Sequence, residues 1–197
     1  MQDNKTTPDS ILDTALELAA NQHWEAVRLT DVALKMNLSL ADLHLYINEK
    51  EDLIDLLWDR ADRYMLLKCQ SAVFDNPDFP AQFEHCVMTW LDSLAPYRNT
   101  VTQMLQVRLE PGHLHIQLPT LFRISRTVQW MREICGRDAT FLKRASEEIA
   151  LTTIFVTTAC FWLRDKSMNA SHTRSHLSYT IRNAVKLENF WPGNSST

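Results

Sequence analysis

Two short groupings of residues have side chains that could do chemistry. His113 and His115 could bind a metal ion together, but no cysteine, histidine or carboxylate follows at ligand spacing. His85 and Cys86 are adjacent, so on a helix they would not face each other as a base and its nucleophile. The sequence also has no phosphate-binding loop and no dinucleotide fingerprint. We therefore expect no enzyme activity, no metal site and no cofactor.

A different set of polar side chains lies within residues 28–50. Hydroxyl, imidazole and cationic groups of this kind contact the phosphates and base edges of a DNA duplex. For each of them the plainer alternative is a solvated or packed residue at a helix end, or a helix cap. The candidates for DNA contacts are Arg28, Thr30, Ser39, Asp42, His44, Tyr46 and Lys50.

The elements that must position these residues are predicted to be helices. Only three of 197 residues are glycine, which argues against strands joined by tight turns and against phosphate-cradling loops. We predict an all-α fold of about nine helices. Asn37 is expected to adopt a left-handed turn, and Ser39 to cap the helix that follows. The predicted helices begin at Thr7–Ser10 and at Leu29–Asp31, cover Leu40–Ile47, and open at Lys50 or Glu51.

Proline-containing breaks divide the rest of the chain. They predict helices over about 80–94, 97–109 and 119–135, the last opened by Pro119, and then over 140–165 and 171–187. The predicted organisation is a helix-turn-helix head (residues 1–53), a helical body (54–191) and a flexible tail (192–197).

Residues 11–53, ILDTALELAANQHWEAVRLTDVALKMNLSLADLHLYINEKEDL, resemble the DNA-binding head of the TetR family of bacterial regulators. The body resembles that family more loosely, through SLAPYR (93–98), LPTLFRISRTVQWMRE (118–133) and FWLRDKSMNASHT (161–173). The resemblance implies a homodimeric transcriptional repressor that binds double-stranded DNA through its third helix. A small apolar effector would release it. Leu40 replaces a cation of the family's pattern, and Asp42 replaces a phosphate-contacting threonine.

A second family fits some of the same stretches. Residues 95–98, 141–145 and 161–167 resemble TetR-like accessory proteins of ubiquinone biosynthesis, which bind lipid rather than DNA. The charge of the head bears on this choice. Residues 1–52 hold four basic and ten acidic side chains, a net of −6 against −4 for the whole chain, whereas a duplex-binding surface neutralises phosphates with Lys and Arg. The acidic head favours the lipid-binding alternative, and the helix-turn-helix spacing favours the regulator.

The resemblance also implies an effector pocket among the middle helices of the body. Met fills irregular space and Trp gives a flat apolar surface, so such side chains suit an apolar effector or lipid. At helical spacing they are more often part of the core. The candidate ligand-binding residues are Met88, Trp90, Met104, Phe122, Trp130, Met131 and Phe155.

The last two predicted helices are expected to form a homodimer interface. The run Ile149–Leu163 is apolar on more than one face, which a helix packed on one side would not need. Pairing with its own copy would build a symmetric four-helix interface. The candidate interface residues are Ile154, Thr158, Phe161, Trp162, Leu177 and Ile181.

The remaining patterns are those of a cytoplasmic protein. The polar start MQDNKTTPDS does not read as a signal peptide, and the longest apolar run is shorter than the roughly 20 residues of a membrane-spanning helix. Four widely spaced cysteines are expected to be buried thiols in a reducing compartment.

A basic stretch in the body is expected to be a solvated face, or else to contact an acidic head, an anionic lipid or a partner protein. It comprises Arg123, Arg126, Arg132, Arg137, Lys143 and Arg144.

Overall fold

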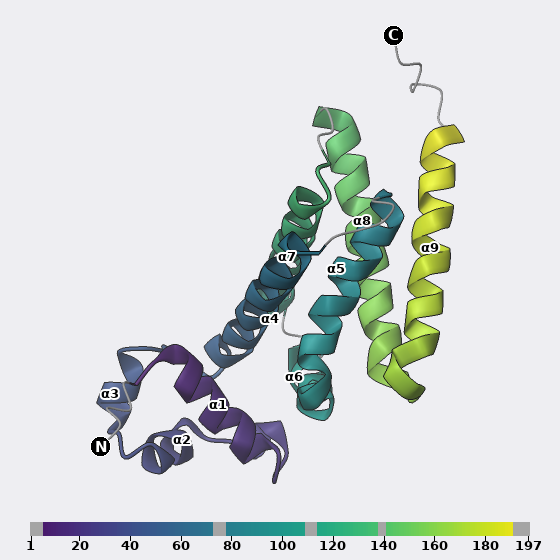
Figure 1. The fold of residues 1–197 in the computed structure, drawn as a ribbon. Helices are drawn as coiled ribbons and strands as arrows, with labels where there is room; N and C mark the ends of the chain where they lie inside the picture. Colours follow the sequence, from purple (N-terminus) through teal and green to yellow (C-terminus); the bar gives the residue numbers. More distant parts are fainter. Residues whose placement is uncertain (1–5, 73–77, 109–113, 138–140, 191–197) are drawn as a thin grey trace. The chain divides into compact units, whose positions relative to one another are not determined.

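The computed structural model of the chain describes residues 6–72, 78–108, 114–137 and 141–190. Within these ranges the elements are nine α-helices and three short 3-10 helices, with no strand (Figure 1). The predicted all-α fold is therefore confirmed. The predicted tail and His113 lie outside the described residues, as does the side chain of His115.

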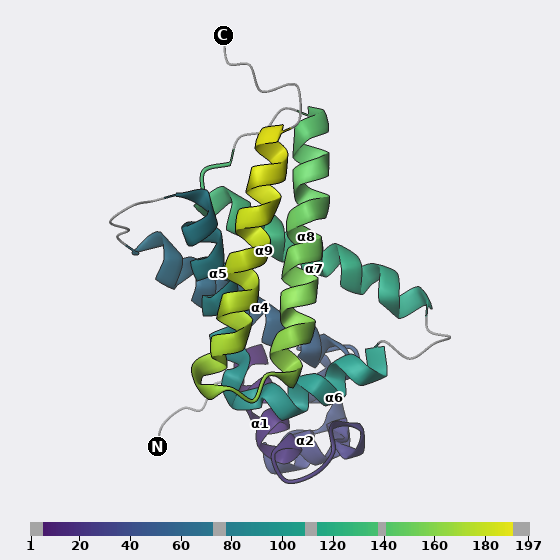
Figure 2. The ribbon, with the colours of Figure 1, turned by 90° about the vertical axis from the view of Figure 1, so that its right-hand side faces the viewer.

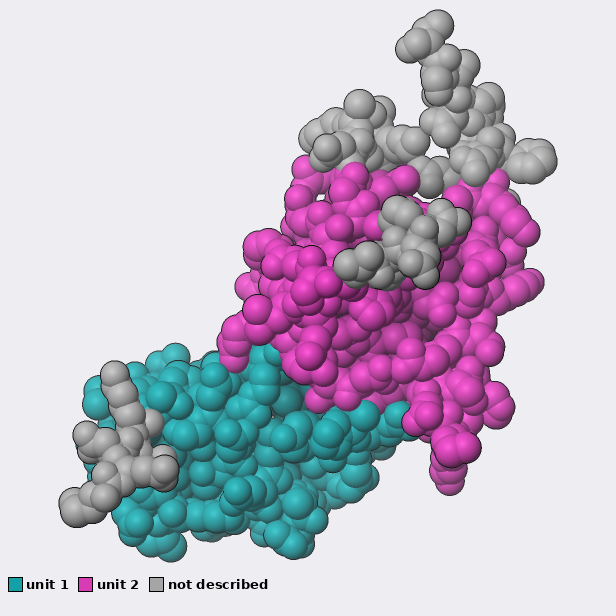
Figure 3. Space-filling view, viewed as in Figure 1, with its two compact units in different colours: residues 1–61, 94–114 teal, residues 62–93, 115–197 magenta. Residues whose placement is uncertain are grey.

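The described residues group into two compact units (Figure 3). The first unit comprises Met1–Ala61 and Leu94–Leu114, and the second comprises Asp62–Ser93 and His115–Thr197. The first of the three points at which the chain passes between the units lies inside α4 (Asp52–Gln70). The head predicted at residues 1–53 is thus one part of the first unit, which also contains α6 (Arg98–Arg108).

The first unit begins with α1 (Pro8–Ala19), whose start follows from its local sequence. The Thr7 hydroxyl accepts a hydrogen bond from the Ser10 amide, and the Ser10 hydroxyl accepts one from the Thr7 amide, so a capping box closes the first turn. Ile11, Leu12 and Ala15 are fully buried on one face of the helix. A 3-10 turn, η1 (Trp24–Ala26), follows. The backbone amide of Trp24 donates a hydrogen bond of 2.7 Å to the side-chain oxygen of Gln103 in α6.

Two short helices, α2 (Leu29–Lys35) and α3 (Leu40–His44), are joined by a tight turn. Asn37 has φ +56°, and the Leu38 amide donates to the Ala33 carbonyl at 2.9 Å, which ends α2. Ser39 then caps α3. The predicted left-handed Asn37 and the predicted Ser39 cap are both confirmed.

The second unit contains the second half of α4 with α5 (Phe79–Leu94), α7 (Leu114–Ile134), α8 (Phe141–Arg164) and α9 (Ser171–Phe190). The two long helices α8 and α9 lie side by side in both ribbon views (Figures 1 and 2). Helix α7 begins five residues before Pro119, so the prediction that Pro119 opens this helix was wrong. Leu114, Leu118 and Leu121 follow helical spacing across the proline, and this pattern outweighs the one backbone hydrogen bond that proline removes. None of the helices, where described, combines the length and hydropathy needed to cross a membrane.

The corner between α8 and α9 is built around one carboxylate. Asp165 accepts hydrogen bonds from the amide and hydroxyl of Ser167 at 2.8 and 2.6 Å, and from the amide and hydroxyl of Thr173 at 2.8 and 2.6 Å. Burial raises the pKa of Asp165, but these four hydrogen bonds outweigh it and hold the pKa well below its ordinary value. The corner also contains the short helix η3 (Met168–Ala170), in which Asn169 and Ala170 have positive φ.

Candidate nucleic-acid interface

The exposed face of α3 (Leu40–His44) and the residues just after it carry both polar and apolar side chains. Leu43 and Ile47 anchor the segment in the core, while His44 and Tyr46 are exposed, as a contact with DNA would require. Large aliphatic side chains are exposed beside them, with Leu40 52% and Leu45 80% accessible. The same surface therefore offers two polar groups and an apolar patch.

Ser39 and Asp42 are engaged with each other. The Asp42 carboxylate accepts hydrogen bonds from the Ser39 amide at 3.1 Å and the Ser39 hydroxyl at 2.6 Å, while that hydroxyl accepts the Asp42 amide. The hydrogen bond from the Ser39 hydroxyl, with help from its amide, lowers the pKa of Asp42, so this carboxylate stays ionised. The Ser39 proton is thus already donated within the chain, and Asp42 closes a capping box in place of the family's threonine.

Lys50 is turned into the protein. Its ammonium donates to the Trp24 carbonyl at 2.6 Å and to the Glu25 carbonyl at 3.1 Å, and it lies 4.8 Å from the centroid of the Trp24 ring. Burial lowers the pKa of Lys50. The Lys50 ammonium therefore holds the 3-10 turn, while its predicted phosphate contact stays a prediction.

The other cations near the head are mostly paired. Lys35 binds Glu17 at 2.7 Å, and Arg60 of α4 binds Asp9 and Asp13 at 3.2 and 2.6 Å. Arg28, at the start of α2, is exposed and makes no side-chain interaction with another described residue. Thr30, two residues further along the chain, is also exposed. The predicted contacts that keep free polar side chains are therefore Arg28, Thr30, His44 and Tyr46.

The predicted effector residues separate into three groups. Met88, Trp90, Met131 and Phe155 are buried in the second unit, where the Trp90 and Phe155 rings meet edge to face with centroids 5.2 Å apart. Met104 is buried in the first unit. Phe122 and Trp130 are 73% and 47% exposed on α7. The sequence could not separate these groups, because helical spacing alone does not say which face a neighbour covers.

A buried polar cluster lies beside Trp90 and was not predicted. Asp62 of α4 accepts the Trp90 indole N–H at 2.8 Å, the Arg123 guanidinium at 2.8 Å and the Thr127 hydroxyl at 3.0 Å. Asp62 and Arg123 are only 7% and 6% exposed. A buried charge pair is stable only when its polar atoms are hydrogen-bonded. The Asp62–Arg123 pair therefore places a polar cluster within the largely apolar core of the body.

A second buried arrangement corrects the expected basic face. Glu147 of α8 binds Arg132 at 3.3 Å and Arg137 at 2.6 Å, and Arg132 is almost fully buried. With Arg123 paired to Asp62, three cations of the basic stretch stabilise the interior of the second unit. Arg126 and Arg144 are exposed, and the side chain of Lys143 is outside the described part of the chain.

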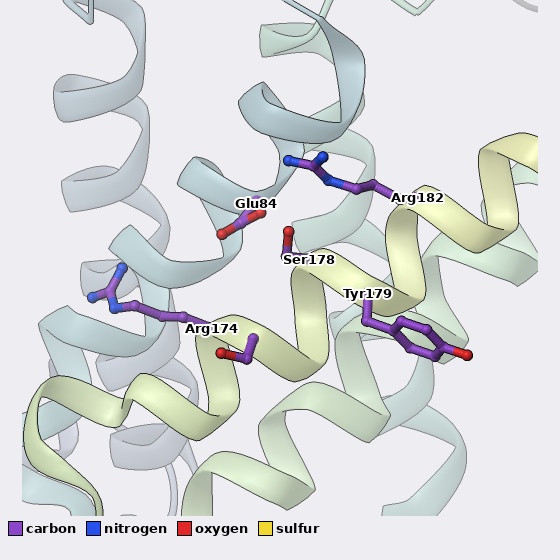
Figure 4. Close-up of a pocket in the computed structure, with 6 residues that line it drawn as sticks. Glu84, Arg174, Ser178, Tyr179 and Arg182 are labelled. Atoms are coloured by element: carbon purple, nitrogen blue, oxygen red, sulfur yellow. The ribbon is translucent and has the colours of Figure 1, made fainter.

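The surface of the second unit is hollowed between α5 and α9 (Figure 4). This open groove of about 560 Å³ is lined by residues with charged or hydroxyl groups, and one of its arginines, Arg174, binds Asp92 at 2.6 Å. It does not coincide with the predicted apolar pocket. Its lining residues are Glu84, Arg174, Ser175, Ser178, Tyr179 and Arg182. No group of three metal-ligating side chains occurs among the described residues.

The four cysteines are free thiols, of which Cys69 and Cys86 are buried. Cys135 is half-buried and Cys160 is exposed, so the expectation that all four would be buried was wrong for these two.

Five of the six predicted interface residues are used within the chain. Phe161 is 42% exposed and stacks on the His176 ring at 4.9 Å between centroids. The other five, which are Ile154, Thr158, Trp162, Leu177 and Ile181, are buried. The exposed face of α8 is formed instead by other residues of the same run, among them Ile149, Thr153 and Thr157.

Comparisons with known proteins agree with this geometry. Neither protein-family models nor curated proteins gave a match. Among solved structures, the chain is similar to the TetR transcriptional regulator from Nitrosomonas europaea ATCC 19718, with a TM-score of 0.78 and 43% sequence identity. The match covers 91% of this chain and 98% of that one. At this identity and coverage, the chain belongs to the TetR family of transcriptional regulators.

Proposed function

We propose that the chain is a homodimeric repressor that binds double-stranded DNA through α3 and the start of α2. The observation that carries this proposal is the set of exposed polar side chains on the two helices and at their ends, namely Arg28, Thr30, His44 and Tyr46. Phosphate contacts supply most of the affinity of such proteins, and each cation adds to the dependence on salt. With Arg28 as its main free cation, the head binds duplex weakly, with a shallow salt dependence.

Effector control is assigned to the second unit, around Trp90. Met88, Met131 and Phe155 supply apolar surface there, and the Asp62–Arg123 pair supplies a polar centre. A small, largely apolar effector bound among these residues changes the separation of the two heads. Half-sites are one helical turn apart, about 34–36 Å, so a changed separation releases the operator.

The dimer contact is assigned to the exposed ridge Ile149, Thr153, Thr157 and Phe161 of α8. The Thr153 and Thr157 hydroxyls donate at 2.8 Å to the carbonyls of Ile149 and Thr153, so their protons are already used within the helix. A ridge with satisfied hydroxyls and aliphatic groups suits pairing with its own copy.

A fluorescence-anisotropy titration against duplexes from the region upstream of the protein's own gene tests DNA binding at low and moderate salt. We expect saturable binding that Arg28→Ala weakens, with a salt slope smaller by about 1. Lys35→Ala is the matched control, because Lys35 is already paired with Glu17. Absence of binding at low salt would overturn the proposal.

A second candidate function is favoured by exposed aromatic residues on α7. Phe122 and Trp130 are eight positions apart on one helical face, with Arg126 between them, and all three are exposed. Aromatic and cationic side chains arranged in this way suit a lipid surface. Flotation with vesicles containing anionic lipid separates the candidates. Vesicle binding lost in Phe122→Ser/Trp130→Ser, together with no DNA binding, would favour the TetR-like lipid-binding accessory protein.

A further inference from the structure

Leu40, Ala41 and Leu45 form an exposed apolar surface, which we call the apolar face of α3. Leu40 and Leu45 are 52% and 80% accessible, and Ala41 is exposed as well. At about 3.6 residues per turn, these positions lie within an arc of about 140°, which also includes His44 and leaves out the buried Leu43. Apolar side chains that are scattered singly over a surface are ordinary, whereas apolar side chains that gather on one exposed face mark a contact site.

The charges beside the apolar face of α3 are negative. Asp42 lies on the same helix, and its exposed carboxylate accepts hydrogen bonds from neutral donors only, so it keeps its charge. Residues 1–52 hold ten acidic side chains against four basic ones. Of these four, Lys35 is paired with a glutamate and Lys50 donates to two backbone carbonyls. The head therefore presents an apolar contact area within a negative electrostatic field.

A DNA duplex is complementary to only part of this surface. Its phosphates are repelled by the Asp42 carboxylate, and its major groove offers aliphatic side chains only the methyl group of thymine. A helix with a row of Leu, Ile or Met side chains flanked by Lys and Arg supplies what the duplex lacks. Its apolar row can bury Leu40 and Leu45, while its cations approach the carboxylate of Asp42.

We propose that the apolar face of α3 is a docking surface for a basic amphipathic helix of a partner protein. His44 and Tyr46 are exposed on or beside the same surface, so a bound helix excludes the duplex from the head. The docking surface rests on exposure and charge alone and stands whether or not the head binds DNA. The exclusion of the duplex rests in addition on the proposed function.

The first experiment titrates the full chain into a fluorescein-labelled peptide of leucine and lysine. The peptide is designed as an amphipathic helix of about 18 residues, or about five turns. Two comparison peptides separate the two features of the surface. One has the same composition in scrambled order and lacks the apolar row, and the other keeps the row but has glutamate in place of lysine. By fluorescence anisotropy, we expect saturable binding of the first peptide and at least about tenfold weaker binding of the other two.

Substitutions in the chain locate the bound peptide. Leu40→Ser and Leu45→Ser each remove an exposed aliphatic side chain, so the fold is expected to be kept, and the melting temperature checks this. We expect each variant to bind the amphipathic peptide about tenfold more weakly, because one leucine contact is lost. Leu67→Ser is the matched control and is expected to bind as the parent does, because Leu67 is 73% exposed on α4 in the second unit.

Asp42→Asn distinguishes the peptide from DNA. It removes a charge that attracts lysine and repels phosphate, so we expect weaker peptide binding with a smaller salt dependence, against tighter duplex binding. Unlabelled duplex is expected to displace the peptide at the concentrations at which the duplex binds the chain, and simultaneous binding of both would overturn the competition. If the peptide binds and the duplex does not, the docking surface stands and the DNA-binding part of the proposed function fails.

Other results would overturn the docking surface itself. They are the absence of saturable binding of the basic amphipathic peptide at low salt, equal binding of the scrambled peptide, and unchanged binding in both leucine variants. Light scattering covers a further occupant, a second copy of the chain. Self-association that Leu45→Ser abolishes would assign the apolar face of α3 to that second copy and not to a partner protein.

Discussion

The ammonium of Lys50 donates a hydrogen bond of 2.6 Å to the backbone carbonyl of Trp24 and lies 4.8 Å from the centroid of the same residue's ring. Trp24 is itself buried, and its backbone amide donates a hydrogen bond to the Gln103 side chain of α6. One lysine thus fixes the 3-10 turn η1 against the segment that opens α4. Lys50, a predicted DNA contact, thus also joins two segments of the head.

Replacing Lys50 by Met is expected to destabilise the protein. Methionine keeps most of the aliphatic stem but leaves two carbonyl oxygens without their charged donor, a loss of about 1.5–3 kcal/mol. Urea denaturation measures the change in the free energy of unfolding. The control is Lys35→Met, which removes an exposed ion pair with Glu17 and is expected to cost under about 1 kcal/mol. Equal losses of stability in the two variants would contradict the stabilising role of the hydrogen bonds from Lys50.

Replacing Asp42 by Asn is expected to tighten DNA binding. The amide oxygen still accepts from the Ser39 amide and hydroxyl, so α3 keeps its cap, while the negative charge beside the duplex is lost. We expect little change in melting temperature and a several-fold gain in affinity by fluorescence anisotropy. Glu49→Gln removes the same charge after α3 and serves as the control. If both variants gain equally, only net charge matters and Asp42 is not close to the DNA.

The local signals of the head were readable from the sequence, whereas the long-range pairs were not. Asn37 and Ser39 act on neighbouring backbone groups, so turn and cap chemistry predicts them. Lys50 is hydrogen-bonded to Trp24, 26 positions away in the sequence, and Arg123 to Asp62, 61 positions away. Hydrophobic periodicity does not predict such pairs. The exposed face of the Ile149–Leu163 run in α8 was equally hard to predict. The apolar character of the run was evident, but only the packing of α9 shows which face stays exposed.

Stability in acid is expected to depend on Asp165. Because the folded protein holds the pKa of Asp165 below its ordinary value, its contribution is fully present above about pH 4 and falls as pH drops toward the folded-state pKa. Asp165→Asn removes this dependence and is expected to cost about 1.5–3 kcal/mol near neutral pH. Urea midpoints measured from pH 7 to pH 3 check it. Asp92→Asn, in an exposed pair with Arg174, is the control and should change the profile little. A constant difference between Asp165→Asn and the parent at every pH would refute the assignment.

The buried Asp62–Arg123 pair is expected to show strong coupling. Arg123→Met leaves the Asp62 carboxylate with only the Trp90 and Thr127 donors and is expected to cost about 3–5 kcal/mol. Asp62→Leu leaves the buried Arg123 guanidinium without the opposite charge of Asp62. The double variant removes both charges, so its loss should be well below the sum of the two. Urea denaturation of the four proteins closes the cycle, and additive losses would mean that the pair does not act as a unit.

A charge placed on the exposed ridge of α8 is expected to separate the proposed dimer. Thr157 is exposed, and its hydroxyl is satisfied by the Thr153 carbonyl, so the residue offers a methyl group to a partner rather than a hydrogen bond. In a two-fold interface every substitution occurs twice, and Thr157→Arg brings two guanidinium groups together in a surface that cannot hydrate them. Size-exclusion chromatography with light scattering should report a dimer for the parent and a monomer for Thr157→Arg. Gln70→Arg adds the same charge at an exposed position of α4 and should stay dimeric. A parent that is monomeric at micromolar concentration, or a Thr157→Arg variant that stays dimeric, would move the interface away from this ridge.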